Sequence, residues 1–210
     1  MSDAPPREFS VSAPASVLAG RIVLHIQSLV PQGRARCLDV GRGDMKLAEA
    51  IEKRALHTDW RCIGVDPVPA SVGDDARWSK WRQSDGRTIP YADREFDVAL
   101  LCDVLHQAPE DAARLLAEAG RVADHVLVKD NFEDGPYSRT MLRLAGMIAS
   151  EGSGARVPQH YFTREGFVRL AAEQHLVITA LDSGLDLYEH VPVVGTLLRP
   201  DWQFIAVLRH

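Results

Sequence analysis

The feature that most constrains this chain is a short apolar segment that ends in a glycine turn and leads into a helical pattern. Residues 36–40 (Arg-Cys-Leu-Asp-Val) precede Gly41-Arg42-Gly43. Residues 44–56 then carry apolar side chains at helical spacing, and residues 62–66 form a second apolar segment. A strand, a turn, a helix and another strand make a βαβ unit, so we expect these two strands to be parallel.

The same alternation continues along the chain and predicts an α/β fold, a Rossmann-like doubly wound sheet of seven strands. The predicted strands are the apolar segments 36–40, 62–66, 81–85, 96–102, 125–129, 176–188 and 202–208. The helical patterns that separate or flank them are 15–30, 44–56, 109–121, 136–150 and 164–175. We expect one domain over residues 1–210.

The C-terminal half departs from simple alternation. The pattern over 136–150 predicts an extra amphipathic helix with one apolar face, consisting of Tyr137, Met141, Leu144, Ala145 and Ile148. Thr163 is expected to cap the helix over 164–175. Residues 189–201 are predicted to link the last two strands without a clear helix, and residues 1–14, with three prolines, are predicted to be a loose arm.

The first glycine turn is the best candidate for a ligand site. Ligands of open parallel sheets bind beyond the carboxyl ends of the strands, where glycine lets the backbone come close. Asp39 can accept hydrogen bonds there, and Asp66 can bind both hydroxyls of a ribose. Asp44 disfavours the pyrophosphate of a dinucleotide, and Lys46 stands where the third glycine of the dinucleotide motif belongs. The turn therefore favours a nucleotide-type ligand with a positive centre.

On these motifs the chain resembles the class I S-adenosylmethionine-dependent methyltransferases, in particular the type 11 group that acts on small molecules. The segments that carry the resemblance are Leu38–Gly43, Gly64–Asp66, Ser84–Gly86 and Phe96–His106. The resemblance implies S-adenosylmethionine as cofactor, S-adenosylhomocysteine as product, and an antiparallel last strand. It assigns the cofactor to Asp39, Gly41, Arg42, Gly43, Asp66, Pro67, Asp85, Gly86, Cys102 and Asp103.

Three groups of residues are candidates for the chemistry. His106 follows the fourth strand and is the candidate general base, with a packing role as the alternative. Lys129, Asp130 and Asn131 end the fifth strand and are candidates to orient a substrate, with a solvated strand end as the alternative. Residues 132–161 are a candidate substrate lid, with a role in the hydrophobic core as the alternative. The candidate substrate contacts in this segment are Tyr137, Arg139, Met141, His160 and Tyr161.

The expected activity is methyl transfer to an O, N or C centre of a small metabolite. Because Met45 and Arg42 depart from the family pattern, a catalytically silent binding protein on the same scaffold is the alternative. A nicotinamide oxidoreductase is disfavoured by the glycine pattern.

Composition and sequence pattern limit the partners and the cellular compartment that we expect. The net charge of −5, with no basic stripe, argues against a nucleic-acid partner. The three cysteines, Cys37, Cys62 and Cys102, lack CxxC spacing, so we expect buried thiols and no metal site. There is no signal-peptide pattern and no apolar run long enough for a membrane span, which predicts a cytoplasmic protein. The 189–201 link is a candidate homodimer contact.

Overall fold

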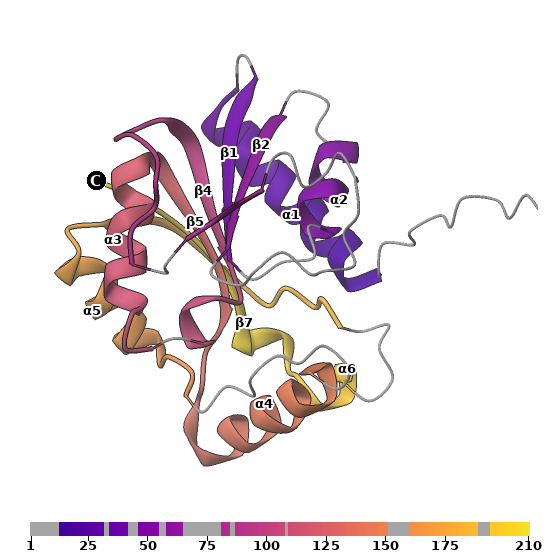
Figure 1. The fold of residues 1–210 in the computed structure, drawn as a ribbon. Coiled ribbons are helices and arrows are strands. Elements are labelled where there is room, and N and C mark those ends of the chain that lie inside the picture. The colour runs from indigo at the N-terminus through magenta and orange to yellow at the C-terminus, as the bar shows by residue number, and fades with distance from the viewer. Residues whose placement is uncertain are drawn as a thin grey trace, which may run out of the picture.

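The computed structural model describes residues 13–31, 34–41, 46–54, 58–64, 81–84, 87–107, 109–150, 160–188 and 194–210. The predicted α/β fold is confirmed: one mixed sheet lies between layers of helices (Figure 1). Its strands are β1 (Ala35–Val40), β2 (Thr58–Gly64), β3 (Trp81–Gln83), β4 (Phe96–Cys102), β5 (Ala123–Asn131), β6 (Val177–Ser183) and β7 (Gln203–Arg209).

The strand order is β3-β2-β1-β4-β5-β7-β6. Strands β1 to β5 pair in parallel, and β7 runs antiparallel to both β5 and β6. Strands β2 and β3 lie on one side of β1. Strands β5, β7 and β6 lie on the other side, beyond β4, with β7 between β5 and β6. The order therefore reverses between β1 and β4, and that reversal is the switch point at which open α/β sheets bind ligands.

Side chains alternate along the central strands, so each strand supplies both faces of the sheet. On one face, residues such as Leu100 and Leu127 pack with Ile22 of α1 (Ala13–Leu29) and Ile51 of α2 (Lys46–Arg54). On the other face, α3 (Ala112–Val122) and α5 (Arg164–Glu173) cover a second apolar cluster. Burial on both faces explains why β4 is apolar almost throughout.

Two further helices and two 3₁₀ turns lie toward the carboxyl edge of the sheet. Helix α4 (Gly135–Ser150) contacts the short helix α6 (Val194–Leu197), and both lie below the sheet in Figure 1. The turns are η2 (Leu105–Gln107) and η3 (Pro200–Trp202). A small apolar cluster, the α4 cluster, joins these elements and consists of Leu142, Ala145, Tyr161, Leu198 and Trp202.

The structure corrects three sequence predictions in this region. The predicted apolar face of α4 is displaced by one residue, because Tyr137 is 65% exposed and Leu144 40% exposed, whereas Ser138 and Leu142 are buried. The 189–201 link, predicted to lack a helix, contains α6 and most of η3; residues 189–193 lie outside the described residues. Strand β6 ends at Ser183, five residues before its predicted end at 188.

Strand β2 begins at Thr58, four residues before its predicted start at 62, and its predicted last two residues lie outside the described residues. Two other predictions agree more closely with the structure. Helix α1 spans 13–29 against a predicted 15–30, so it takes in the last two residues of the predicted arm. Thr163 caps α5 as expected, accepting a hydrogen bond from the backbone N–H of Gly166 at 3.0 Å. Residues 1–12 lie outside the described residues. None of the described helices is both long and apolar enough to cross a membrane.

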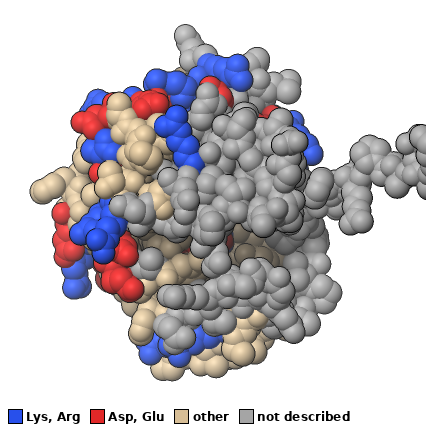
Figure 2. Space-filling model, viewed as in Figure 1, with Lys and Arg blue, Asp and Glu red and all other residues tan. Residues whose placement is uncertain are grey.

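Charged side chains of both signs are interleaved on the described surface, as Figure 2 shows on its left side. Several of them form ion pairs between neighbouring elements, for example Arg36 with Asp97 and Arg121 with Asp93. These exposed pairs match the scattered arrangement of Lys and Arg seen in the sequence.

The corrected face of α4 predicts unequal effects for two leucines of the same helix. Leu142→Ala should lower the free energy of unfolding by about 2–5 kcal/mol, because it leaves a cavity in the α4 cluster. Leu144→Ala is the matched control and should cost less than about 1 kcal/mol. Urea unfolding followed by circular dichroism measures both; equal losses would contradict the assigned face.

Candidate active site

The site is built where β4 and β5 end side by side. Their parallel register pairs Cys102 with Lys129, so the residues that follow each strand meet at one edge of the sheet. Asp103 comes directly after β4, and its φ of +54° turns the chain sharply into η2, which carries His106. Aspartate is among the few residues that tolerate this left-handed conformation. Asp130 and Asn131 close β5 on the other side.

Lys129 and Asp103 form a largely buried ion pair. The Lys129 Nζ lies 2.7 Å and 2.8 Å from the two carboxylate oxygens of Asp103. The lysine side chain is 1% exposed, and that of Asp103 is 32% exposed. Burial by itself lowers the pKa of Lys129, but the charge and hydrogen bond of Asp103 together with Tyr188 and Cys102 outweigh it, and the net shift is upward. Lys129 therefore stays protonated, and the predicted alternative of a solvated strand end is wrong.

His106 and Asp130 form a second buried pair. The His106 Nδ1 lies 2.5 Å from Asp130 Oδ1, and the two side chains are 6% and 1% exposed. Burial lowers the pKa of His106, while the charge and hydrogen bond of Asp130 raise it, and the net shift is upward. The ring of Tyr161 lies beside the imidazole, with ring centroids 4.9 Å apart. Among the described residues, His106 Nε2 has no hydrogen-bond partner.

Asn131 lies between the two pairs. Its backbone N–H donates to Asp130 Oδ1 at 2.7 Å, and its side-chain Nδ2 lies 3.4 Å from Asp103 Oδ1. The side-chain oxygen Oδ1 is buried and has no hydrogen-bond partner among the described residues. An unpaired buried acceptor costs about 1–3 kcal/mol, so this oxygen is a group that needs an explanation.

Asp103, His106 and Asp130 offer ligand atoms that all lie within 4.8 Å of one another, which is close enough to hold a metal ion. The Lys129 ammonium, however, contacts both oxygens of Asp103 and supplies a positive charge at that carboxylate. A divalent ion bound there would be repelled by the ammonium. The expectation of no metal site therefore remains a prediction that this geometry favours.

The first glycine turn lies at the switch point beside this site. A Cβ on Gly41 would come within 2.6 Å of Val104 Cγ2, so the close approach of the turn to the segment after β4 excludes any side chain. Among the described glycines, positive φ occurs at Gly135 and Gly184 but not at Gly41. Gly41 is therefore needed for space. Asp39 is half-buried near the end of β1.

Cys102 ends β4 with its thiol 3.8 Å from an Asp103 oxygen, and burial raises the pKa of that thiol well above its usual value. Cys37 is buried as predicted, and both are free thiols. The remaining predicted cofactor residues lie outside the described residues; they are Arg42, Gly43, Asp66, Pro67, Asp85 and Gly86.

The predicted lid residues do not gather at one place. Tyr161 is buried beside His106, and its hydroxyl donates to the Leu142 carbonyl at 3.2 Å. Met141 packs against the α4 cluster. Tyr137 is exposed against Trp202, Arg139 is paired with Glu133 at 2.7 Å, and His160 is exposed. Of the five candidates, the structure brings only Tyr161 into direct contact with His106.

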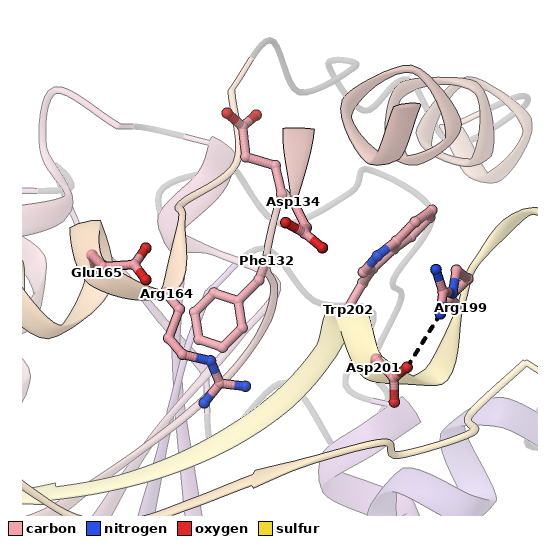
Figure 3. A pocket seen from close by; sticks show the side chains of 8 residues that line it. Phe132, Asp134, Arg164, Glu165, Arg199, Asp201 and Trp202 are labelled. Atoms are coloured by element: carbon pink, nitrogen blue, oxygen red, sulfur yellow. Dashed lines mark ion pairs between the residues drawn. The ribbon is translucent and has the colours of Figure 1, made fainter. Parts of the chain in front are cut away.

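A separate cavity of about 330 Å³ opens next to the end of β5 (Figure 3). Phe132, Trp202 and charged side chains line it, but none of the predicted site residues does. Arg164 lies 5.1 Å from the Phe132 ring, and Arg199 pairs with Asp201 at 3.6 Å. We place the chemistry at His106 and not in this cavity, because these neighbouring charges include no buried acid–base pair.

The sequence patterns predict most residues of the site, but they do not indicate two of its contacts. Tyr188 lies with its ring 5.9 Å from Lys129 Nζ, and no motif marks it, since it follows β6 in an irregular segment. The pairing of His106 with Asp130 was also missed. This contact depends on the pairing and register of β4 and β5, which the sequence pattern does not give.

Comparisons with known proteins find a family similarity over the first five strands. Residues 38–125 match the type 11 family described as "Methyltransferase domain". Over this segment, which is less than half of the chain, the sequence is similar to the methyltransferase domain family. The match covers β1 to β5 and therefore includes Gly41, Asp103 and His106. S-adenosylmethionine is the cofactor expected from this similarity. No curated protein matches the sequence.

Solved structures share the fold of this chain. The mitomycin 7-O-methyltransferase MmcR is 17% identical with a TM-score of 0.62, and the alignment covers 94% of this chain but 53% of that one. The chain thus spans about half the length of MmcR. Methyltransferases from Methanosarcina mazei and Mesorhizobium loti are each 14% identical, with TM-scores of 0.58 and 0.60. The alignments cover 85% and 89% of this chain and 93% and 96% of those chains.

The close contact at Gly41 predicts a reversible defect. Gly41→Ala should weaken S-adenosylmethionine binding by about tenfold or more, because overpacking costs about 1–3 kcal/mol and displaces the turn. Removing the obstructing methyl groups in Gly41→Ala/Val104→Ala should restore most of the affinity. Calorimetric titration measures both proteins. A double variant as weak as the single one would show that crowding against Val104 is not the cause.

Proposed function

We propose that this protein transfers the methyl group of S-adenosylmethionine to an O, N or C centre of a small metabolite, with His106 as general base. The observation that carries the proposal is the buried His106–Asp130 pair, in which Nδ1 is engaged and Nε2 has no partner among the described residues. Asp130 accepts from Nδ1–H, and this hydrogen bond selects the tautomer whose Nε2 carries a free lone pair. His106 itself lies in η2, which follows β4 at the edge of the sheet where ligands of this fold bind.

The described residues fit the cofactor. Gly41 has no side chain at the switch point, and the carboxylate of Asp39, which suits a ligand with a positive centre, lies near the end of β1. Asp103, whose charge is balanced by Lys129, can accept hydrogen bonds from hydroxyl groups of the ligand. Together with Cys102 they would hold the cofactor, along with the residues that the resemblance assigns in the turns outside the described residues. When bound, S-adenosylmethionine supplies an electrophilic methyl group on a sulfonium.

The proton balance then follows from His106. Methylation of a hydroxyl or amine acceptor would require that the proton of the acceptor atom be removed. Nε2 takes the proton from the acceptor, and Asp130 stabilises the imidazolium that results. Tyr161 covers one face of the ring and limits access of water to it.

Several features support a small-molecule acceptor. Lys129, Asp130, Asn131 and Tyr161 surround the base with buried groups that can orient a compact ligand. One protein of similar fold is named as an O-methyltransferase of mitomycin, which favours an oxygen acceptor. We propose that residues 132–161 form the substrate side of the site. The free thiols of Cys37 and Cys102 are consistent with the reducing cytoplasm as its compartment.

The first test is cofactor binding. Calorimetry should show stoichiometric binding of S-adenosylmethionine and S-adenosylhomocysteine to the wild-type protein. His106→Gln should bind both with unchanged affinity but lower kcat by about 10²–10⁴-fold, the usual contribution of general acid–base catalysis. Absence of binding to both compounds would defeat the proposal, and full activity of His106→Gln would remove the base from it.

The raised pKa of His106 predicts the pH dependence. A protonated imidazole cannot accept a proton, so the rate should fall as the pH decreases through the pKa of His106, which lies above 6.5. Asp130→Asn removes the charge that raises this pKa, so the midpoint should move to lower pH while kcat falls. The pH profile of kcat in both proteins measures this; an unchanged midpoint would contradict the assignment.

A further inference from the structure

The side-chain oxygen of Asn131 is a buried hydrogen-bond acceptor that the mechanism above does not use. Asn131 is 8% exposed, and among the described residues nothing donates to its Oδ1. Its orientation is set at the other end of the amide, where Nδ2 lies 3.4 Å from Asp103 Oδ1. Rotating the amide by 180° would place two oxygens against each other, so the acceptor must point away from Asp103.

The charges around Asn131 limit what can bind to this acceptor. Asp103 carries a negative charge and Lys129 a positive charge at 2.7 Å, so the pair presents no net charge. The ammonium would repel a cationic ligand group or a divalent ion brought close to it. A neutral hydroxyl or N–H meets no such penalty and satisfies the oxygen. The best partner for Asn131 Oδ1 is therefore a neutral hydrogen-bond donor.

Asn131 and His106 are held by the same carboxylate. Asp130 Oδ1 accepts from the backbone N–H of Asn131 at 2.7 Å and lies 2.5 Å from Nδ1 of His106. The side chains of Asn131 and His106 also flank Asp103, one through the Nδ2 contact and the other within 4.8 Å. Among the described residues, two atoms of the site thus have no hydrogen-bond partner, His106 Nε2 and Asn131 Oδ1, and the residues that carry them share Asp130.

We propose that the methyl acceptor carries a second, neutral hydroxyl or N–H near the atom that is methylated, and that Asn131 recognises it. His106 takes the proton from the reacting group, and Asn131 Oδ1 accepts a hydrogen bond from the neighbouring one. Asn131 is then a specificity-determining residue. This inference rests on the proposed function, since it places the acceptor at His106.

The test compares matched acceptors with the full-length protein and S-adenosylmethionine, following S-adenosylhomocysteine formation. The donor-bearing probes are catechol, resorcinol and 2-aminophenol. The matched probes are phenol and 2-fluorophenol, because fluorine is close to a hydroxyl in size but donates no hydrogen bond. We expect kcat/KM for at least one donor-bearing probe to exceed that for 2-fluorophenol by about tenfold or more.

Asn131→Leu removes the acceptor at similar volume and should reduce this preference to less than about threefold. A merely structural role would lower all probes alike and leave the ratio unchanged. Gln174→Leu, the same kind of change at the C-terminal end of α5, is the control and should keep the wild-type ratio. Thermal unfolding and the Kd for S-adenosylhomocysteine, measured on each variant, show whether the fold and the cofactor site persist.

The outcomes separate the two proposals. A wild-type ratio near one, an unchanged ratio in Asn131→Leu, or no methylation of any donor-bearing probe by protein that binds the cofactor would overturn the role of Asn131. Loss of cofactor binding in the wild type, or activity that does not depend on His106, would instead defeat the proposed function.

Discussion

The parallel pairing of β4 with β5 is the constraint on which the rest of the site depends. Its register places Cys102 opposite Lys129. The segment from Asp103 to His106, which follows β4, therefore shares one edge of the sheet with the last residues of β5. Both strands are buried on both faces and therefore cannot slip without exposing apolar side chains. Packing of the central sheet thus fixes where the polar groups meet.

The charged residues at this edge of the sheet are buried in pairs. Lys129 and Asp130 would be costly to bury alone, because each would lose its hydration without compensation. Each instead finds a partner from the segment after β4, Asp103 for Lys129 and His106 for Asp130. The positive φ of Asp103 turns the chain so that both partners come from one short segment. The site therefore has little net charge but several fixed directions for hydrogen bonds.

The C-terminal elements convert this edge into a partly enclosed site. The α4 cluster holds Tyr161 by its hydroxyl on Leu142 and by packing, and Tyr161 in turn lies against His106. Tyr188, after β6, reaches the other pair at Lys129. Residues distant in sequence thus cover the ion pairs from two sides, which keeps the dielectric low where proton transfer is proposed.

The sequence by itself determined the alternation of strands and helices, the glycine turn after β1, the cap at Thr163 and the identity of the residues at the strand ends. These follow from local periodicity and turn chemistry, which need no distant contacts. Only the tertiary structure decided which face of α4 is buried, because Ser138 and Leu142 pack against elements that lie far along the chain. It also decided that His106 meets Asp130, that Lys129 is buried against Asp103, and that Asn131 keeps a free acceptor. Those facts depend on which strands are neighbours and in what register, and a linear pattern of residue types does not encode the register.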